Sequence, residues 1–468
     1  MSGGKNSTGT RHRRLDAPAG NRAGSGPGPT RRRVLGAGLA GGALLLTGAT
    51  GCATGGAGAP NAKRLDASSG GKAVGKITIW SWDVAAKAMQ RLGKAFEQAH
   101  PGTTVDVVDI GYDNAYDKIT VGLGAGSGLP DVLTVEGHRM PTYIGNFPHA
   151  LVDLTSRAGG LAKDFAPSVW RTVTDAGGRV LALPWDSGPC ALFYRRDHFQ
   201  QAGIDPATLT TWDDYLAAGT TLKDRTGKKL LILDAKQDSM FALLLQQQGQ
   251  GWFVDGKVAV ASPAAERALT LMKQLVDRGL VDFENGWDGL VSGTHDGKAS
   301  TTPTAAWWDG TLTGDMADLN GKFGVVPLPA FDPGGCRTSN SGGSTLSVTA
   351  QSKNPELAWE FLSFLLADRA NQASMMEHEG LFPAYLPALD DPYFQQPDPY
   401  YANQPAMRLF ADLARSIPTV ETTADDSKAG DIVNTAVNQV LHNGADPGTV
   451  LRSAARQIAT ATSRQPAP

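Results

Sequence analysis

Short apolar runs alternate with longer amphipathic stretches from residue 76 onward. Residues 76–80 (KITIW) and 105–110 (VDVVDI) have the composition of short strands. The segment between them places Met89, Leu92 and Phe96 on one face of a helix. A strand, a helix and a second strand in this order predict a β-α-β unit with parallel strands, because the crossover returns the chain in the same direction.

Polar and aromatic residues follow the ends of these predicted strands. Trp82 and Asp83 come just after the first strand, Tyr112 follows the second, and Glu136 ends a third strand that begins near Val132. Ligands bind beyond the carboxyl ends of parallel strands, so these four residues are candidates for ligand contact. The alternative, that they are solvated loop residues, stays open.

Residues 179–215 predict a passage between two domains. A buried strand at 180–183 breaks at Pro184, and a new apolar run begins at Ala191. Asp186 lies between them and either faces a ligand or caps the turn that follows. A strand that stops at proline and glycine and then restarts is typical of a chain that leaves one domain for another.

Helix start signals dominate the second half of the chain. Thr211 and Asp214 form a predicted capping box, and Ser262-Pro263 and Asn354-Pro355 each begin another helix. Residues 231–233 and 257–260 are short strand candidates. These elements predict a second α/β region beyond residue 190.

Trp307, Trp308 and Asp309 form an unusual group in a predicted loop. A carboxylate beside paired indoles is costly in an apolar interior, so the group indicates a binding surface. Neighbouring residues in an extended segment point in opposite directions, so we expect one tryptophan to face ligand and the other to pack. Trp252 is a weaker candidate, and the glycine-rich segment 339–344 is a second possible passage between domains.

The N-terminal segment has the features of an export signal. A twin-arginine run at Arg31-Arg32-Arg33 precedes an apolar stretch at 34–48, and residues 49–52 (ATGC) resemble a lipobox that ends in Cys52. We predict a signal peptide at 1–51, lipidation of Cys52, and a flexible tether at 52–75. The protein would be exported and anchored to the outer face of the cytoplasmic membrane. The alternative is a basic tail before a chance apolar stretch.

Length and charge limit the remaining possibilities. A chain of 468 residues exceeds what one hydrophobic core usually organises, so two lobes are expected. Residues 1–51 hold eight of the 43 basic residues and one of the 46 acidic residues, so the mature chain carries a formal charge of −10. Such a surface does not favour nucleic acid. Three cysteines provide no disulfide framework.

Several ordered blocks together resemble one known family, the family 1 extracellular solute-binding proteins. These are the lipid-anchored receptors of ABC importers related to maltose-binding protein. The blocks are GLPDV at 128–132, LPWDSGPCALFYRRDHFQQAGIDP at 183–206, TWDD at 211–214, FGVVPLP at 323–329, GGS at 342–344, KNPELAWEF at 353–361, GLFPA at 380–384 and TAV at 435–437. The order of the set carries the resemblance, because no single block is specific.

The resemblance implies an α/β fold with two lobes, the periplasmic-binding-protein-like fold of type II. Each lobe would be a mixed, mostly parallel sheet flanked by helices, and a hinge would join the two. The N-lobe would comprise 76–185 plus 343–378, and the C-lobe 186–342 plus 379–468. The first crossover would fall at 184–188 and the second near Gly342-Gly343.

The resemblance also implies a receptor that closes on a solute and is not an enzyme. It would be a monomer without cofactor or metal, would bind a mono- or oligosaccharide, and would deliver it to ABC permease subunits in the membrane. Indoles would stack on sugar rings, and carboxylates would accept hydroxyl hydrogens. The expected ligand-binding residues are Trp82, Asp83, Tyr112, Glu136, Asp186, Trp252, Trp307, Trp308, Asp309, Ser341, Gly343 and Phe382.

The sequence departs from the family pattern at Cys190 and Cys336. Two thiols in an oxidising compartment favour a disulfide near the hinge, and two buried unpaired cysteines are the alternative. Ala429-Gly430 stands where the maltose receptor has aromatic residues, which weakens the expectation of stacking there.

Other functions stay open at this stage. An exported carbohydrate-active enzyme could use two of the many carboxylates, although the chain has no HExxH, GxSxG or Walker-type motif. A receptor of the same fold could bind glycerol phosphate, a polyamine or a peptide. A structural adhesin would bind no small molecule.

Overall fold

The computed structural model describes residues 63–66, 73–234 and 239–467, without the side chains of residues 112–114. The predicted signal peptide, Cys52 and most of the predicted tether lie outside the described residues. No helix within the described ranges has the length and apolar character needed to cross a membrane.

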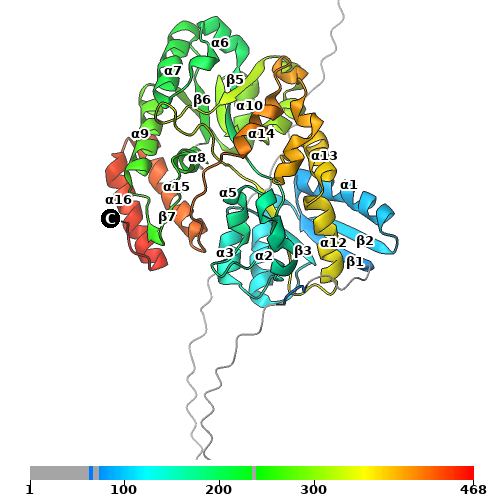
Figure 1. Ribbon diagram of the computed structural model, residues 1–468. Coiled ribbons are helices and arrows are strands. Elements are labelled where there is room, and N and C mark those ends of the chain that lie inside the picture. The colour runs from blue at the N-terminus through cyan, green and yellow to red at the C-terminus, as the bar shows by residue number, and fades with distance from the viewer. Residues whose placement is uncertain (1–62, 67–72, 235–238, 468) are drawn as a thin grey trace, which may run out of the picture. The chain divides into compact units, whose positions relative to one another are not determined.

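A five-stranded sheet organises the first part of the chain, which we call the N-lobe (Figure 1). Its strand order is β2-β1-β3-β12-β4. The N-lobe elements are β1 (Gly75–Ser81), α1 (Asp83–Ala99), β2 (Thr103–Asp109), α2 (Tyr112–Ala125), β3 (Val132–Glu136), α3 (Met140–Asn146), α4 (Thr155–Ala158), α5 (Pro167–Trp170), β4 (Leu183–Pro184), β12 (Ser344–Val348), α12 (Pro355–Leu366) and α13 (Arg369–Glu379). Strand β1 pairs in parallel with β2 and β3, so the predicted β-α-β unit is confirmed.

Strand alternation divides the N-lobe into two apolar layers. Ile77 and Ile79 of β1 pack with α1 and α12 on one face of the sheet. Leu133 and Val135 of β3 pack with α2 and α3 on the other face. Successive side chains of a strand point to opposite faces, so β3 contributes Val132 to the first core and Leu133 and Val135 to the second.

A three-stranded antiparallel sheet organises the second part, which we call the C-lobe, and its strand order is β10-β5-β11. The C-lobe elements are β5 (Cys190–Arg195), α6 (Arg196–Ala202), α7 (Trp212–Thr226), β6 (Leu231–Asp234), α8 (Ser239–Gln247), β7 (Phe253–Val254), β8 (Lys257–Val258), α9 (Pro263–Asp277), β9 (Val281–Glu284), α10 (Gly286–His295), β10 (Thr301–Ala305), α11 (Trp308–Asp315), β11 (Phe323–Pro327), α14 (Ala406–Ala414), α15 (Asp426–Asn443) and α16 (Pro447–Thr462). Strands β6 and β9 form a separate parallel pair. Where one lobe ends and the other begins stays a prediction.

The antiparallel C-lobe sheet corrects one detail of the expected fold, which was a mostly parallel sheet in each lobe. Strand β5 carries the chain away from the crossover at 184–188, whereas β11 leads back toward the crossover at 339–344. The two strands are neighbours, so they must run in opposite directions. A further correction concerns the predicted strand at 180–183, of which only Leu183 belongs to β4. Val180 makes a single bridge to Thr174 instead.

The predicted capping box at the start of α7 is confirmed. Thr211 Oγ1 accepts a hydrogen bond from Asp214 N at 3.2 Å, and Asp214 Oδ2 accepts one from Thr211 N at 2.8 Å. These bonds satisfy backbone N–H groups that have no partner within the helix.

Replacing Thr211 by Ala is expected to lower the free energy of unfolding by about 1 kcal/mol, because one capping bond is lost. Thr220→Ala in the same helix is the matched control: Thr220 is exposed, and its hydroxyl bonds only to Leu216 O four residues back. Urea unfolding followed by circular dichroism measures both. Equal midpoints for the two variants would contradict a stabilising role for the cap.

Candidate functional site

Three segments that connect the lobes, around residues 185–188, 341–344 and 382–384, are hydrogen-bonded to one another. We call this the crossover seam. The bonds run from Trp185 N to Ser344 O (2.9 Å), from Ser187 N to Phe382 O (2.9 Å), from Ser341 N to Gly188 O (2.9 Å) and from Ala384 N to Trp185 O (3.2 Å). The seam therefore joins three passages of the chain into one connection.

Glycine is required at two positions of the seam. A Cβ atom on Gly188 would lie 1.9 Å from the backbone oxygen of Ser341. Gly343 has φ +95°, a conformation that residues with a side chain rarely adopt, and its Cβ would lie 3.0 Å from Asp186 O. The close approach of the segments thus depends on two residues without side chains.

Asp186 belongs to the seam. Its Oδ1 accepts a hydrogen bond from Ser344 N at 2.6 Å, which ties the first crossover to the second. Desolvation by burial raises the pKa of Asp186 from 3.8 to about 6. The side chain therefore connects the two crossovers, and its contact with a ligand stays a prediction.

A cluster of aromatic and charged side chains stands at the N-lobe end of the seam. The hydroxyl of Tyr116 donates to Glu136 Oε2 at 2.6 Å. Arg139 lies over the Tyr116 ring, 4.1 Å from its centroid, and its Nε is 3.5 Å from Glu136 Oε2. Trp82 is 8% exposed, and the centroid of its ring lies 5.7 Å from that of Tyr116. We call Trp82, Tyr116, Glu136 and Arg139 the N-lobe cluster.

Gly137 joins this cluster to the seam, because its N–H donates to Gly343 O at 2.8 Å. The next residue, His138, has a side chain that is 59% exposed. Burial nevertheless lowers the pKa of His138.

Indoles stand at the C-lobe end of the seam. Trp307 is half-buried, and its Nε1 donates to Ser341 O at 3.0 Å. Trp287 at the start of α10 is 48% exposed, and its ring lies 5.8 Å from the Trp307 ring. These two residues help to line a cavity of about 90 Å³ together with Asp234 and Ser239.

Trp287 was not among the candidates derived from the sequence. It follows strand β9 by three residues, so the same rule that selected Trp82 and Glu136 would have selected it. Its strand (VDFE) was too short and too polar to be recognised from the pattern alone.

These contacts form one continuous series. It begins at Trp82 and Tyr116, passes through Glu136 to the seam at Gly343, and reaches Trp307 by way of Ser341. The structure thus connects candidate residues from distant parts of the sequence along the junction of the lobes. We take this series as the candidate site.

Three predicted ligand contacts face the interior. Trp308 is 1% exposed and packs in the C-lobe core at the start of helix α11, and it also lines the cavity beside Trp287 and Trp307. Asp309 is 8% exposed, and its Oδ1 accepts a hydrogen bond from the hydroxyl of Tyr401 at 2.7 Å. Burial raises the pKa of Asp309 to about 6. Phe382 is 1% exposed and meets Phe394 edge to face, so only its backbone oxygen reaches the seam.

The other predicted residues occupy varied places. Asp83 is exposed at φ +44°, a strained value for a residue with a side chain. Trp252 stacks on Phe241, with ring centroids 6.0 Å apart, and packs against the C-lobe core. The backbone of Tyr112 begins α2, and its side chain lies outside the described residues. Ser341 and Gly343 take part through their backbone atoms.

The predicted disulfide is absent from the structure. Both thiols are free: Cys190 Sγ donates to Gly188 O at 3.4 Å, and Cys336 Sγ donates to Thr338 O at 3.3 Å. Each thiol is thus directed to a carbonyl of its own segment. Burial raises the pKa of the Cys190 thiol, which disfavours the reactive thiolate.

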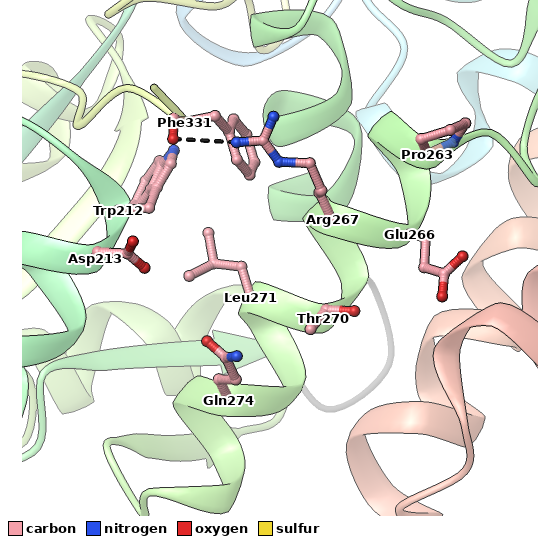
Figure 2. Close-up of a pocket in the computed structure, with 9 residues that line it drawn as sticks. All are labelled: Trp212, Asp213, Pro263, Glu266, Arg267, Thr270, Leu271, Gln274 and Phe331. Atoms are coloured by element: carbon pink, nitrogen blue, oxygen red, sulfur yellow. Dashed lines mark hydrogen bonds between the residues drawn. The ribbon is translucent and has the colours of Figure 1, made fainter. Parts of the chain in front are cut away.

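A wider groove of about 450 Å³ lies elsewhere, between α7 and α9 of the C-lobe (Figure 2). Trp212 on its wall is 3% exposed, with its indole N–H bonded to Gln247. Arg267 covers Phe331 at 5.1 Å and donates to the Phe331 backbone oxygen, as Figure 2 shows. Since its aromatic faces are covered, this groove offers little surface on which a ring could stack.

Comparison with known proteins agrees with the architecture. Residues 81–372 match the family described as bacterial extracellular solute-binding protein. The lactose-binding protein of Rhizobium radiobacter is 27% identical over 358 residues, which cover 74% of this chain and 83% of that protein. The arabinooligosaccharide-binding protein of Bacillus subtilis (strain 168) is 26% identical over 384 residues, covering 79% and 88%.

Solved structures agree with the predicted two-lobe fold. The binding protein of B. animalis subsp. lactis Bl-04 in complex with β-1,6-galactobiose has a TM-score of 0.70 at 23% identity and covers 83% of this chain and 98% of its own. The sugar-binding protein MalE of Xanthomonas citri has a TM-score of 0.71 at 18% identity and covers 83% and 98%. The α/β periplasmic-binding-protein-like fold and the family resemblance inferred from the sequence are confirmed.

The buried carboxyl of Asp186 predicts a pH dependence of stability. Its folded-state pKa of about 6 exceeds its ordinary value of 3.8, so its stabilising contribution is present below about pH 4 and is lost as the pH rises through 6. Asp186→Asn keeps an oxygen acceptor for Ser344 N and removes the buried charge. We expect this variant to be more stable than the parent by about 1–3 kcal/mol near pH 7.5, with a difference that shrinks toward pH 4.

Urea unfolding at several pH values between about 4 and 7.5 measures this difference. Asp224→Asn, at an exposed position of α7, is the control and should show no such trend. A difference between Asp186→Asn and the parent that does not change with pH would contradict the argument.

Proposed function

We propose that this chain, which belongs to the bacterial extracellular solute-binding protein family, binds an oligosaccharide at the junction of its two lobes and delivers it to an ABC importer. Solute binding without chemical conversion is the activity of the family, so the chain is not an enzyme. The choice of an oligosaccharide is supported by relatives named for lactose and for arabinooligosaccharides.

One observation carries the proposal: the series of contacts that places aromatic rings at both ends of the crossover seam and a carboxylate at its N-lobe end. A sugar ring has an apolar C–H face and a rim of hydroxyls. Trp287 and Trp307 offer indole surface from the C-lobe, and Glu136 offers a carboxylate from the N-lobe. Stacking on the rings and hydrogen bonds to the carboxylate match these two properties of a sugar.

The N-lobe cluster is prepared for such contacts. Tyr116 and Arg139 both contact Glu136 Oε2, so the carboxylate has less side-chain freedom to lose when a ligand binds. Each stacked aromatic contributes about 0.5–1.5 kcal/mol beyond area burial, and hydrogen bonds to charged groups contribute about 1.5–3 kcal/mol. A few contacts of each kind are enough for affinity in the micromolar range, about 8 kcal/mol.

Binding would be coupled to closure of the lobes. The seam is the only covalent route between the lobes among the described residues, and it consists of short segments without helices. A solute that touches Glu136 on one lobe and Trp307 on the other gains both sets of contacts only when the lobes are together. Such differential contact shifts the population toward the closed state.

We further propose that the protein is exported through its twin-arginine signal and is anchored by lipid on Cys52. Its proposed partners are the solute and the permease subunits in the membrane. We propose no interaction with nucleic acid. The lipobox at residues 49–52 supports the lipid anchor, and the acidic charge of the mature chain disfavours nucleic acid as a partner. The tether would allow the lobes to reach a permease while the lipid stays in the bilayer.

Replacing Trp287 by Ala, and separately Trp307 by Ala, is expected to raise the dissociation constant for the bound sugar about tenfold or more in each case. Each variant loses one stacking surface and its buried area. Titration of tryptophan fluorescence and calorimetry with lactose, β-1,6-galactobiose and arabinooligosaccharides identifies the sugar and measures the change.

Val254→Ala is the control for these variants, because Val254 is an exposed apolar residue of the C-lobe. It should leave the dissociation constant unchanged. Unchanged affinity in both tryptophan variants would exclude stacking at this site. Binding of none of the sugars would reject the proposed ligand class, and hydrolysis of a sugar would indicate an enzyme.

Replacing Cys52 by Ser is expected to release the protein from the membrane fraction, because the proposed thioether to lipid can no longer form. Cell fractionation and the intact mass of the mature protein measure the change, and Cys336→Ser is the control. A mature N-terminus at a position other than 52 would contradict the proposed anchor.

A further inference from the structure

The lobes also touch at a second place, away from the crossover seam. Thr142 in helix α3 of the N-lobe has its Oγ1 3.2 Å from Ser427 Oγ in α15 of the C-lobe. One helical turn further, Gly145 faces Ala424: a Cβ atom on Gly145 would lie 2.4 Å from Ala424 Cβ. We call Thr142, Gly145, Ala424 and Ser427 the interlobe contact.

The segment that carries Ala424 is held firmly by the C-lobe. Arg464 Nε donates to Asp425 Oδ2 at 2.8 Å, and Glu421 accepts a hydrogen bond from Gly256 N at 3.1 Å. Thr423 donates twice to Asp426 Oδ1, from its backbone N and its hydroxyl, at 2.9 Å each. Ala424 lies between these attachments, so it cannot move away readily.

Helix α3 is equally fixed on the N-lobe side. Met140, Tyr143 and Ile144 are buried in the core that α3 shares with α2 and strand β3. Gly145 follows directly after these buried residues. A larger side chain at position 145 would collide with Ala424, because neither α3 nor the segment that carries Ala424 has room to move away.

On the N-lobe side, the candidate site and the interlobe contact are neighbours along the chain. Glu136 and Arg139 belong to the candidate site, Gly137 bonds to the crossover seam, and Thr142 and Gly145 belong to the interlobe contact. The segment 136–145 therefore carries parts of both.

We propose that the interlobe contact is a latch that forms only when the lobes are closed, and that the missing side chain at Gly145 permits full closure. This inference rests on the proposed function, because it assigns the contact to the binding motion. The latch touches none of the candidate ligand residues, so it sets affinity through the population of the closed state.

A cross-link tests closure without any ligand. In the full chain, Thr142→Cys with Ser427→Cys puts two thiols where the hydroxyl oxygens are 3.2 Å apart. Under mild oxidation we expect a disulfide between positions 142 and 427, identified by the mass of the linked peptide. The parent chain with its own Cys190 and Cys336 is treated in the same way and should give no such peptide.

Adding Gly145→Ala to the cysteine pair is expected to slow cross-linking about tenfold, and adding Ala424→Gly as well should restore the rate, because the second change removes the opposing Cβ. Gly160→Ala is the matched control: it lies in the N-lobe, and a Cβ there has no heavy atom within 4 Å. Circular dichroism and melting of each variant confirm that it is folded.

The same substitutions without the cysteine pair are titrated with lactose, β-1,6-galactobiose and arabinooligosaccharides. We expect Gly145→Ala to raise the dissociation constant about tenfold and Gly145→Ala with Ala424→Gly to return it close to the parent value. The latch would be overturned if Gly145→Ala left the rate of cross-linking unchanged. It would also be overturned if Ala424→Gly did not restore the cross-linking rate and the sugar affinity lost in Gly145→Ala. Cross-linking that responds as expected while no sugar binds would support the latch and reject the proposed ligand.

Discussion

The close approach of three chain segments at the crossover seam is the constraint on which the remaining structure depends. Gly188 and Gly343 allow backbone atoms to approach where a Cβ atom would collide, and the Asp186 carboxylate ties Ser344 to the first crossover. Each lobe has a large hydrophobic core of its own, and a further cluster packs Ala373 and Met376 of α13 against the C-lobe. The relation of the lobes is therefore set by the hydrogen bonds of the seam together with this packing.

The candidate site exists because the ends of the seam meet polar and aromatic residues from both lobes. Glu136 ends β3, Arg139 lies three residues further, and Trp307 follows β10. Each side chain is placed by the end of a strand, and each strand is fixed by its core. Within each lobe the side chains of the site are therefore held in place by a core, which is the preorganisation that a binding site needs.

Burial divides neighbouring residues between structure and recognition. Trp307 and Trp308 are adjacent in sequence, yet Trp308 fills the C-lobe core while Trp307 reaches Ser341. Asp309 has a hydrogen bond to Tyr401 and a raised pKa, as a carboxyl in an interior does. We expected one of the two indoles to pack, and Trp308 does. The reason differs from the one expected, because the two residues lie in the turn that begins α11 and not in an extended segment.

The sequence by itself determined the two-lobe α/β class, the β-α-β start, the capped helices and the glycine-rich crossovers, because these follow from periodicity and local backbone preferences. The tertiary structure alone decided which candidates face the junction. It placed Phe382 and Trp308 inside, made Asp186 a link of the seam, brought forward Trp287, and set Gly145 against Ala424. Those outcomes depend on contacts between residues far apart in the chain, which a local pattern does not encode.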